Sequence, residues 1–328
     1  MRNSAQFEEL LISPYKESLI RFIGQKRALG YKFEPQINLL IRFDGFASIH
    51  SGSSPSELPE KLVRDWVECF ELTTEQRRRR GLLIRQFGEF LQQTGVSAFL
   101  YPKRRFKAPK QYLPYIFTQK QISMIFQQAD KIAVDHPHTG SCADTALIIR
   151  MLYGCGLRIS EALNLKVQDV DLANGIIHIW DSKFQKDRIV PMSDSLLKLC
   201  REHFAQHNVG KMSDSYCFSP DGTRRYSTQT IYNRFRDALF YSGIPHRGKG
   251  KGPRLHDLRH TFAVHSLRQL SERGEDLYTI LPVLSEYMGH SSVSATQYYL
   301  RLTAEVYPDM IEMVGSNFGD IYPGGELL

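Results

Sequence analysis

Histidine and arginine residues gather in the segment Leu255 to His265, which reads LHDLRHTFAVH. His256 and Arg259 are three residues apart, so both fall on one face of the helix that this segment predicts. An arginine offers a planar fork of donors to two oxygens of a phosphate, and a histidine can move a proton near neutral pH. The pair therefore indicates phosphate chemistry, although a structural role fits the same spacing.

Two further cations stand in places that suit the same chemistry. Arg158 lies in GCGLRISEALNL just before Ser160, which we expect to cap the next helix, and helix N-termini attract anions. A surface arginine in a loop is the alternative. Lys183 lies in the polar turn of a predicted β-hairpin, from which its ammonium could protonate a leaving oxygen. Lys186 occupies the same turn, and the spacing leaves the choice between the two open.

A tyrosine doublet, Tyr298 and Tyr299, follows the Gly-His pair of the stretch YMGHSSVSATQYYLRL. A tyrosine hydroxyl, with its pKa near 10, is a poor nucleophile at neutral pH, so a reactive tyrosine needs a group that takes its proton. Aromatic packing is the other interpretation of the doublet.

The basic charge of the chain lies in its first third. Residues 1–115 hold 19 Lys and Arg against 12 Asp and Glu, whereas the remainder holds 23 of each. The runs RRRR (77–80) and KRRFKAPK (103–110) belong to this region, and such a patch is expected of a polyanion-binding protein. Apolar spacing predicts helices at 18–29, 36–49, 59–70 and 75–94, with most of the arginine run facing outward and residues 51–59 forming a loop.

Three prolines within residues 101–117 mark a linker between two domains. We expect an N-terminal helical DNA-binding domain at 1–100, the basic linker at 101–117, a second domain at 118–315 and a C-terminal tail at 316–328. The second domain should be mainly α with a small three-stranded antiparallel sheet within 166–192. Its later helices are predicted at 193–207, 227–242, 256–272, 277–288 and 296–314.

Composition excludes several classes of protein. The 328 residues contain no apolar run of membrane-spanning length, and the first twenty lack the apolar core of a signal peptide. The five cysteines are widely spaced with no C-x-x-C pair, which favours reduced packing residues in a cytoplasmic protein over a zinc or redox site. No metal or nucleotide-binding motif stands out.

The chain carries four motifs in order: the Arg158 segment, the hairpin lysine, the H-x-x-R segment and the Gly-His segment with its tyrosines. This order resembles that of the tyrosine recombinase family, the phage integrase and Xer type of site-specific DNA recombinase. G-L-R-I-S-E-A-L is similar to the first arginine box, H-D-L-R-H-T-F-A to the second, and M-G-H-S-S-V-S-A-T-Q-Y-Y to the tyrosine box. The resemblance covers residues 118–307. It implies an N-terminal helical core-binding (SAM-like) domain followed by a tyrosine recombinase catalytic domain.

The resemblance also implies a role for each matched position. Two arginines would hold the scissile phosphate, two histidines would assist proton transfer and phosphate binding, a lysine would protonate the leaving 5′ oxygen, and a tyrosine would be the nucleophile. We expect His256 to accept the proton and Tyr298 to serve packing. The implied catalytic residues are Arg158, Lys183, His256, Arg259, His290 and Tyr299.

The implied function is cutting and rejoining of double-stranded DNA through a 3′-phosphotyrosine intermediate, without a metal or a small-molecule cofactor. The family works as a homo-tetramer on paired DNA sites and passes a C-terminal segment between protomers, for which residues 316–328 are the candidate. A longer interval before His290 favours a mobile-element integrase, acting in the cytoplasm at the nucleoid. The alternatives are a type IB topoisomerase, a telomere resolvase and a non-catalytic DNA-binding regulator.

Overall fold

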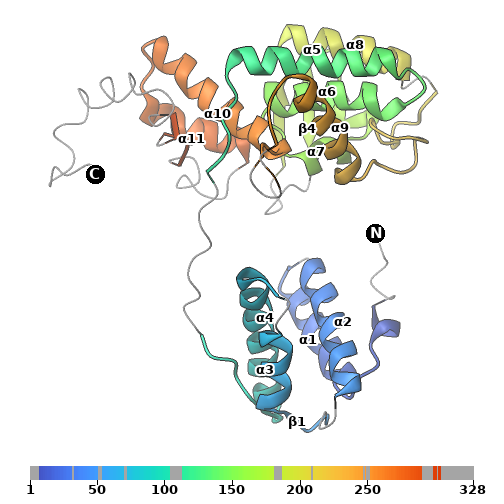
Figure 1. The fold of residues 1–328 in the computed structure, drawn as a ribbon, viewed down its shortest axis with the longest axis vertical. Helices are drawn as coiled ribbons and strands as arrows, with labels where there is room; N and C mark the ends of the chain where they lie inside the picture. The colour runs from blue at the N-terminus through green and yellow to red at the C-terminus, as the bar shows by residue number, and fades with distance from the viewer. Residues whose placement is uncertain are drawn as a thin grey trace, which may run out of the picture. The chain divides into compact units, whose positions relative to one another are not determined.

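The chain divides into two compact units, Met1–Tyr112 and Leu113–Leu328, in the computed structural model (Figure 1). Each unit has its own hydrophobic core. The structure describes residues 7–31, 33–50, 54–69, 72–103, 113–180, 187–207, 210–246, 248, 252–289, 298–300 and 302–303.

The N-terminal unit is a bundle of four helices around an aromatic core. Trp66 packs edge-on against Phe43 with ring centroids 5.1 Å apart, and Phe22 lies 5.6 Å from Phe87. Such tilted pairs stabilise a core beyond the area that they bury. The four predicted helices are confirmed, with ends that shift by no more than two residues. The helices are α1 (Lys16–Ala28), α2 (Glu34–Ile49), α3 (Glu60–Glu68) and α4 (Thr74–Gln93).

A short parallel pair of strands, β1 (Glu57–Leu58) and β2 (Ser97–Ala98), was not predicted. It joins the segment before α3 to the segment after α4. The sequence suggested a loop at residues 51–59, because a strand of two residues is too short to show an alternating pattern.

The arginine run of α4 lies at the surface of the N-terminal unit. Arg79 is exposed, and Arg77, Arg78 and Arg80 are half-buried, so none of the four lies in the core. Arg80 donates to the carbonyl oxygen of Trp66 at 2.6 Å and lies over its indole ring at 4.8 Å. The aliphatic part of an arginine can cover apolar surface while the charge stays at the edge.

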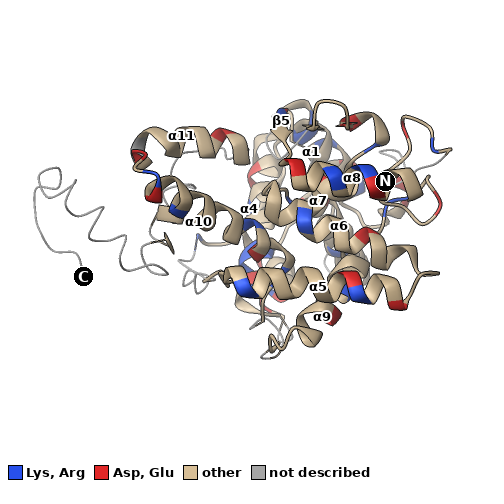
Figure 2. Ribbon diagram, turned by 90° about the horizontal axis from the view of Figure 1, so that it is seen from above, with Lys and Arg blue, Asp and Glu red and all other residues tan. Residues whose placement is uncertain are grey.

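The second unit is built around one buried helix, α6. Ten of its 15 residues are buried, and it packs against α5, α8, α9 and α10. Figure 2 shows acidic and basic residues side by side on the outer helix α5. The predicted helices at 193–207, 227–242, 256–272 and 277–288 are confirmed as α8 to α11. The helices are α5 (Gln119–Asp135), α6 (Gly140–Gly154), α7 (Ile159–Asn164), α8 (Asp194–His207), α9 (Thr228–Tyr241), α10 (Leu255–Glu272) and α11 (Leu277–Met288).

The predicted three-stranded antiparallel sheet is also present. Its order is β3 (Val170–Asp171), β4 (Ile176–Ile179) and β5 (Arg188–Pro191). Ile179 pairs with Arg188, so the arginine stands where β5 leaves the hairpin turn. The turn itself, residues 181–186, lies outside the described residues.

A second apolar cluster of this unit positions the tyrosine doublet. Residues of α10 and α11 pack with Tyr299 and Leu302, and Tyr298 lies partly buried against the same cluster. Of the helix predicted at 296–314, the described residues 298–300 and 302–303 are helical. The tail at 316–328 lies outside the described residues. The mainly α fold class with its small sheet is confirmed.

Candidate active site

Arg158 stands at the N-terminus of α7 and is fixed there by Glu161. Its backbone N–H donates to Glu161 Oε2 at 2.8 Å, and its Nη1 donates to Oε1 at 2.7 Å. The N-cap of α7 is therefore Arg158, and Ser160, which we expected to cap this helix, lies inside it. The carboxylate three residues into the helix accepts from the backbone N–H of the N-cap, which is the glutamate half of a capping box.

Glu161 also binds a second arginine, Arg188 of β5. Arg188 Nη1 and Nη2 donate to the two carboxylate oxygens at 3.0 and 2.8 Å, and Arg259 Nη1 lies 4.0 Å from Oε2. Burial by itself would raise the pKa of Glu161, but the hydrogen bonds and charges of Arg188 and Arg158 hold it at about 2. The carboxylate is thus ionised at neutral pH and binds two arginines from different elements.

Three consecutive carbonyl oxygens at the end of α11 each accept a hydrogen bond from one of these arginines. Arg188 Nε donates to Tyr287 O at 2.9 Å, Arg259 Nη2 donates to Met288 O, and Arg158 Nη2 donates to Gly289 O at 2.8 Å. The last carbonyls of a helix lack partners within it and carry the negative end of its dipole. Cationic side chains therefore suit this helix end.

Arg259 is almost fully enclosed, with 1% of its surface exposed. Its Nη1 donates to the carbonyl oxygen of Gly156. Burial lowers the pKa of Arg259 to about 10, the Arg158 charge acts in the same direction, and Glu161 opposes both. The guanidinium is still protonated at neutral pH, so the site keeps a buried positive charge.

Gly156 is required by the close approach of α10. Its φ is +59°, and a Cβ there would lie 2.5 Å from the ring of Phe262. Gly289, with φ +62°, likewise has Arg188 Nη1 only 3.1 Å from where a Cβ would be. Glycine adopts positive φ without steric cost. These two glycines let the arginine box and the end of α11 close around the arginines.

Tyr299 lies inside the same site with 3% of its surface exposed. Burial raises the pKa of Tyr299 to about 12, although the Arg259 and Arg158 charges lower it. Its hydroxyl is 2.9 Å from His260 Nδ1. The structure thus places the hydroxyl of Tyr299 beside a histidine and within the field of the two arginines.

The structure brings together three of the six predicted site residues, Arg158, Arg259 and Tyr299. His256 is exposed and lies one helical turn before His260, with ring centroids 4.6 Å apart. Lys183, its alternative Lys186 and His290 lie outside the described residues.

Three residues that contact this site were not among the predicted catalytic positions. Glu161 is the carboxylate of R-I-S-E, Arg188 ends the hairpin stretch K-D-R, and His260 follows Arg259 directly. The capping pattern at Arg158 and the i, i+4 spacing of His256 and His260 were visible in the sequence. The contact of His260 with Tyr299 depends on long-range packing, so no local pattern indicates it.

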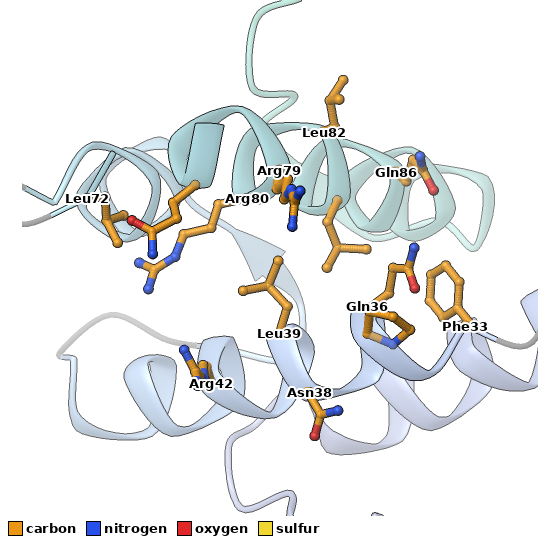
Figure 3. Close-up of a pocket in the computed structure, with 13 residues that line it drawn as sticks. Phe33, Gln36, Asn38, Leu39, Arg42, Leu72, Arg79, Arg80, Leu82 and Gln86 are labelled. Carbon is orange, nitrogen blue, oxygen red and sulfur yellow. The ribbon is translucent and has the colours of Figure 1, made fainter. Parts of the chain in front are cut away.

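The N-terminal unit has a groove of about 570 Å³ between α2 and α4. Figure 3 shows Arg80 reaching from α4 toward α2, while Leu39 reaches from α2 the other way. Arginine and amide side chains, together with apolar residues, line the groove. The polar lining residues are Gln36, Asn38, Arg42, Gln76, Arg79, Arg80 and Gln86.

Within the part of the chain that the structure describes, no group of three or more His, Cys, Asp and Glu is arranged to hold a metal ion. Across those same residues, no helix is long and apolar enough to cross a membrane.

Residues 116–305 match the model of the phage integrase family, which is more than half of the chain. The chain therefore belongs to the phage integrase family, the tyrosine recombinases. It is similar to a putative integrase/recombinase y4rB of Sinorhizobium fredii, with 26% identity over 320 residues, 94% of this chain and 99% of the relative. A tyrosine recombinase XerC of Bradyrhizobium diazoefficiens is 32% identical over 232 residues, 68% of this chain and 65% of that protein.

Solved structures of recombinases share the fold. A lambda integrase dimer bound to a COC′ core site has a TM-score of 0.60 at 16% identity, covering 90% of this chain and 79% of the integrase. The Tn1549 transposon integrase in complex with a circular intermediate DNA has a TM-score of 0.59 at 17% identity, covering 85% and 93%.

Proposed function

We propose that this protein cuts and rejoins duplex DNA at specific sites through a covalent 3′-phosphotyrosine link. The observation that carries the proposal is the buried Tyr299 hydroxyl, which lies 2.9 Å from His260 Nδ1, next to Arg259 in the chain, where the charges of Arg158 and Arg259 act on it. Attack by a phenol on a phosphodiester passes through a five-coordinate phosphorus with added negative charge. Two guanidinium groups stabilise that state more than the ground state.

The arginines are positioned before DNA arrives. Arg158 and Arg259 each bind a carbonyl at the end of α11, and Glu161 holds Arg158 at the start of α7. Fixed donors do not have to reorganise during the reaction, and charge-assisted hydrogen bonds contribute about 1.5 to 3 kcal/mol each. Arg158 keeps 17% of its side chain exposed, which leaves a route for a phosphate oxygen.

The remaining roles follow the family pattern. Lys183 protonates the 5′ oxygen as it leaves, and His256 and His290 assist proton transfer and phosphate binding. The bond energy is kept in the phosphotyrosine, so the 5′-hydroxyl of the same or another strand can reverse the step without ATP.

The groove between α2 and α4 contacts the DNA duplex in this proposal. Glutamine and asparagine read adenine edges in the major groove. Gln36 and Asn38 of α2 supply such amides, and Arg42 of the same helix supplies a cation for a backbone phosphate. The excess positive charge of the first 115 residues adds attraction for the phosphate backbone.

The biological role that we propose is integration or excision of a mobile element in the cytoplasm. The relatives named integrase/recombinase and the transposon integrase with a similar fold support this choice. Strand exchange would use a homo-tetramer on two DNA sites, with residues 316–328 as the candidate segment passed between protomers.

The test is covalent capture of DNA. Sites first selected from a random duplex library by binding are resynthesised with a nick near their centre, so that the cleaved end diffuses away. The proposal predicts an adduct that survives denaturation, and recombination between two intact copies of the site. Relaxation of plasmids that lack the site would instead favour a topoisomerase-like enzyme, and binding without any adduct would favour a regulator.

A further inference from the structure

His260 is placed to act directly on the hydroxyl of Tyr299. It lies on α10 one residue after Arg259, and its Nδ1 is 2.9 Å from Tyr299 Oη. This distance is within the range that a general base needs to take a proton. The two rings also lie close, with centroids 5.5 Å apart.

The hydroxyl of Tyr299 needs such a partner more than an exposed tyrosine would. Tyr299 belongs to the apolar cluster that it shares with residues of α10 and α11, and burial raises its pKa to about 12. At pH 7 a phenol of that pKa is ionised in roughly one molecule in 10⁵. Because so small a fraction of Tyr299 is ionised, its proton must be removed as the hydroxyl attacks.

We infer that His260 is a catalytic residue, the group that accepts the proton of Tyr299 when the tyrosine attacks DNA. This assignment rests on the proposed function. In it, His260 carries its ring proton on Nε2 and accepts the hydrogen bond at Nδ1. It takes over the role of proton acceptor that we expected of His256, and His256 keeps that of a phosphate contact.

The step balances as follows. The bond from Tyr299 Oη to phosphorus forms, the bond from phosphorus to the 5′ oxygen breaks, and the phenol proton moves to His260 Nδ1. The 5′ oxygen takes its proton from a separate acid, for which Lys183 is the candidate. On rejoining, the 5′-hydroxyl attacks phosphorus and His260 returns the proton to Tyr299.

His256 is less well placed for this step in the structure. Its side chain is exposed, one turn before His260, and its ring meets that of His260 edge-on with centroids 4.6 Å apart. It therefore lies beside the proton acceptor at the protein surface. That position suits contact with a phosphate, which approaches from outside.

The experiment measures the rate of adduct formation in a single turnover on the nicked site. The variants are His260→Ala, His260→Gln and His256→Ala, with the exposed His136→Ala as the matched control. Gel shifts and thermal unfolding check that DNA affinity and the fold are kept. Glutamine can hydrogen-bond to Tyr299 but cannot take its proton, so it separates holding the tyrosine from proton transfer.

We expect His260→Ala and His260→Gln each to slow cleavage by about 10² to 10⁴-fold with DNA affinity unchanged. Free imidazole should restore the alanine variant and not the glutamine variant, and His136→Ala should cleave at the wild-type rate. A wild-type rate in His260→Gln, or an alanine variant that imidazole does not restore, would overturn proton transfer to His260. Absence of an adduct with the unaltered protein would instead reject the proposed function.

Discussion

Arg188 binds Glu161 through two hydrogen bonds, and both side chains are almost fully buried, with 6% and 5% exposed. Arg188 belongs to β5, which leads out of the hairpin turn, whereas Glu161 belongs to α7 and also holds Arg158. The position of Arg158 therefore depends on a strand some 30 residues further along the chain. Two elements that share one carboxylate must move together.

Replacing Arg188 by alanine should strongly destabilise the second unit. The change leaves the buried Glu161 with one of its two arginines, and breaking a buried ion pair costs about 3 to 5 kcal/mol. The matched control is Arg268→Ala, which breaks an exposed pair with Glu272 in α10 and should cost about 0 to 1 kcal/mol. Urea unfolding measures both. Equal losses of unfolding free energy in the two variants would show that the buried ion pair contributes no more than the exposed one.

The stability contributed by Glu161 should depend on pH in a defined window. Its folded pKa of about 2 is lower than the ordinary 4.5, so its contribution is complete above pH 4.5 and is lost as the pH falls toward 2. The shift corresponds to about 3 kcal/mol. The difference in unfolding free energy between the unaltered protein and Glu161→Gln should shrink across that range. A difference that stays constant from pH 5 to about 2 would contradict the assigned pKa.

Local patterns were sufficient to predict α1 to α4, α8 to α11 and the three-stranded sheet. The helix that carries Arg259 has clear apolar spacing, and the hairpin before Arg188 has β-branched runs between turn residues. The side chains that bind Arg158 could not be predicted in this way. Arg158 looked like a loop arginine before a serine cap, because the sequence does not show that Glu161 is drawn inward by Arg188.

The contact between His260 and Tyr299 also lay beyond local patterns. The two residues are 39 positions apart, and their contact depends on how α10 and α11 enclose the tyrosine. Spacing put His256 and His260 on one face of a helix, but the choice between them follows only from which one faces the tyrosine. Long-range packing of this kind decides roles that residue types leave open.

Gly156→Ala should destabilise the second unit more than an alanine at another positive-φ glycine. A Cβ at Gly156 would lie 2.5 Å from the Phe262 ring, whereas Gly243, with φ +69°, has no atom within 4 Å of such a Cβ. Both variants lose about 1 to 2 kcal/mol from the left-handed backbone, and overpacking adds about 1 to 3 kcal/mol at Gly156. Thermal unfolding compares the two variants. Identical shifts of the unfolding temperature would mean that the Phe262 ring moves aside without an energetic cost.

Arg42→Ala in the groove of the N-terminal unit should weaken DNA binding and its dependence on salt. Loss of one phosphate contact reduces the slope of log affinity against log salt by about 1. Lys61→Ala is the control, because this exposed lysine of α3 pairs with Asp65 and does not line the groove. Binding titrations at several salt concentrations give both slopes. An unchanged slope for Arg42→Ala would place phosphate binding elsewhere.

The identity of the residue that is linked to DNA tests the central claim most directly. Adduct formed on the nicked site is digested with protease and nuclease, and peptide fragmentation locates the attached nucleotide. The account predicts attachment at Tyr299, no adduct with Tyr299→Phe, and an adduct of wild-type yield with Tyr298→Phe. Attachment at Tyr298, or an adduct that survives Tyr299→Phe, would contradict it.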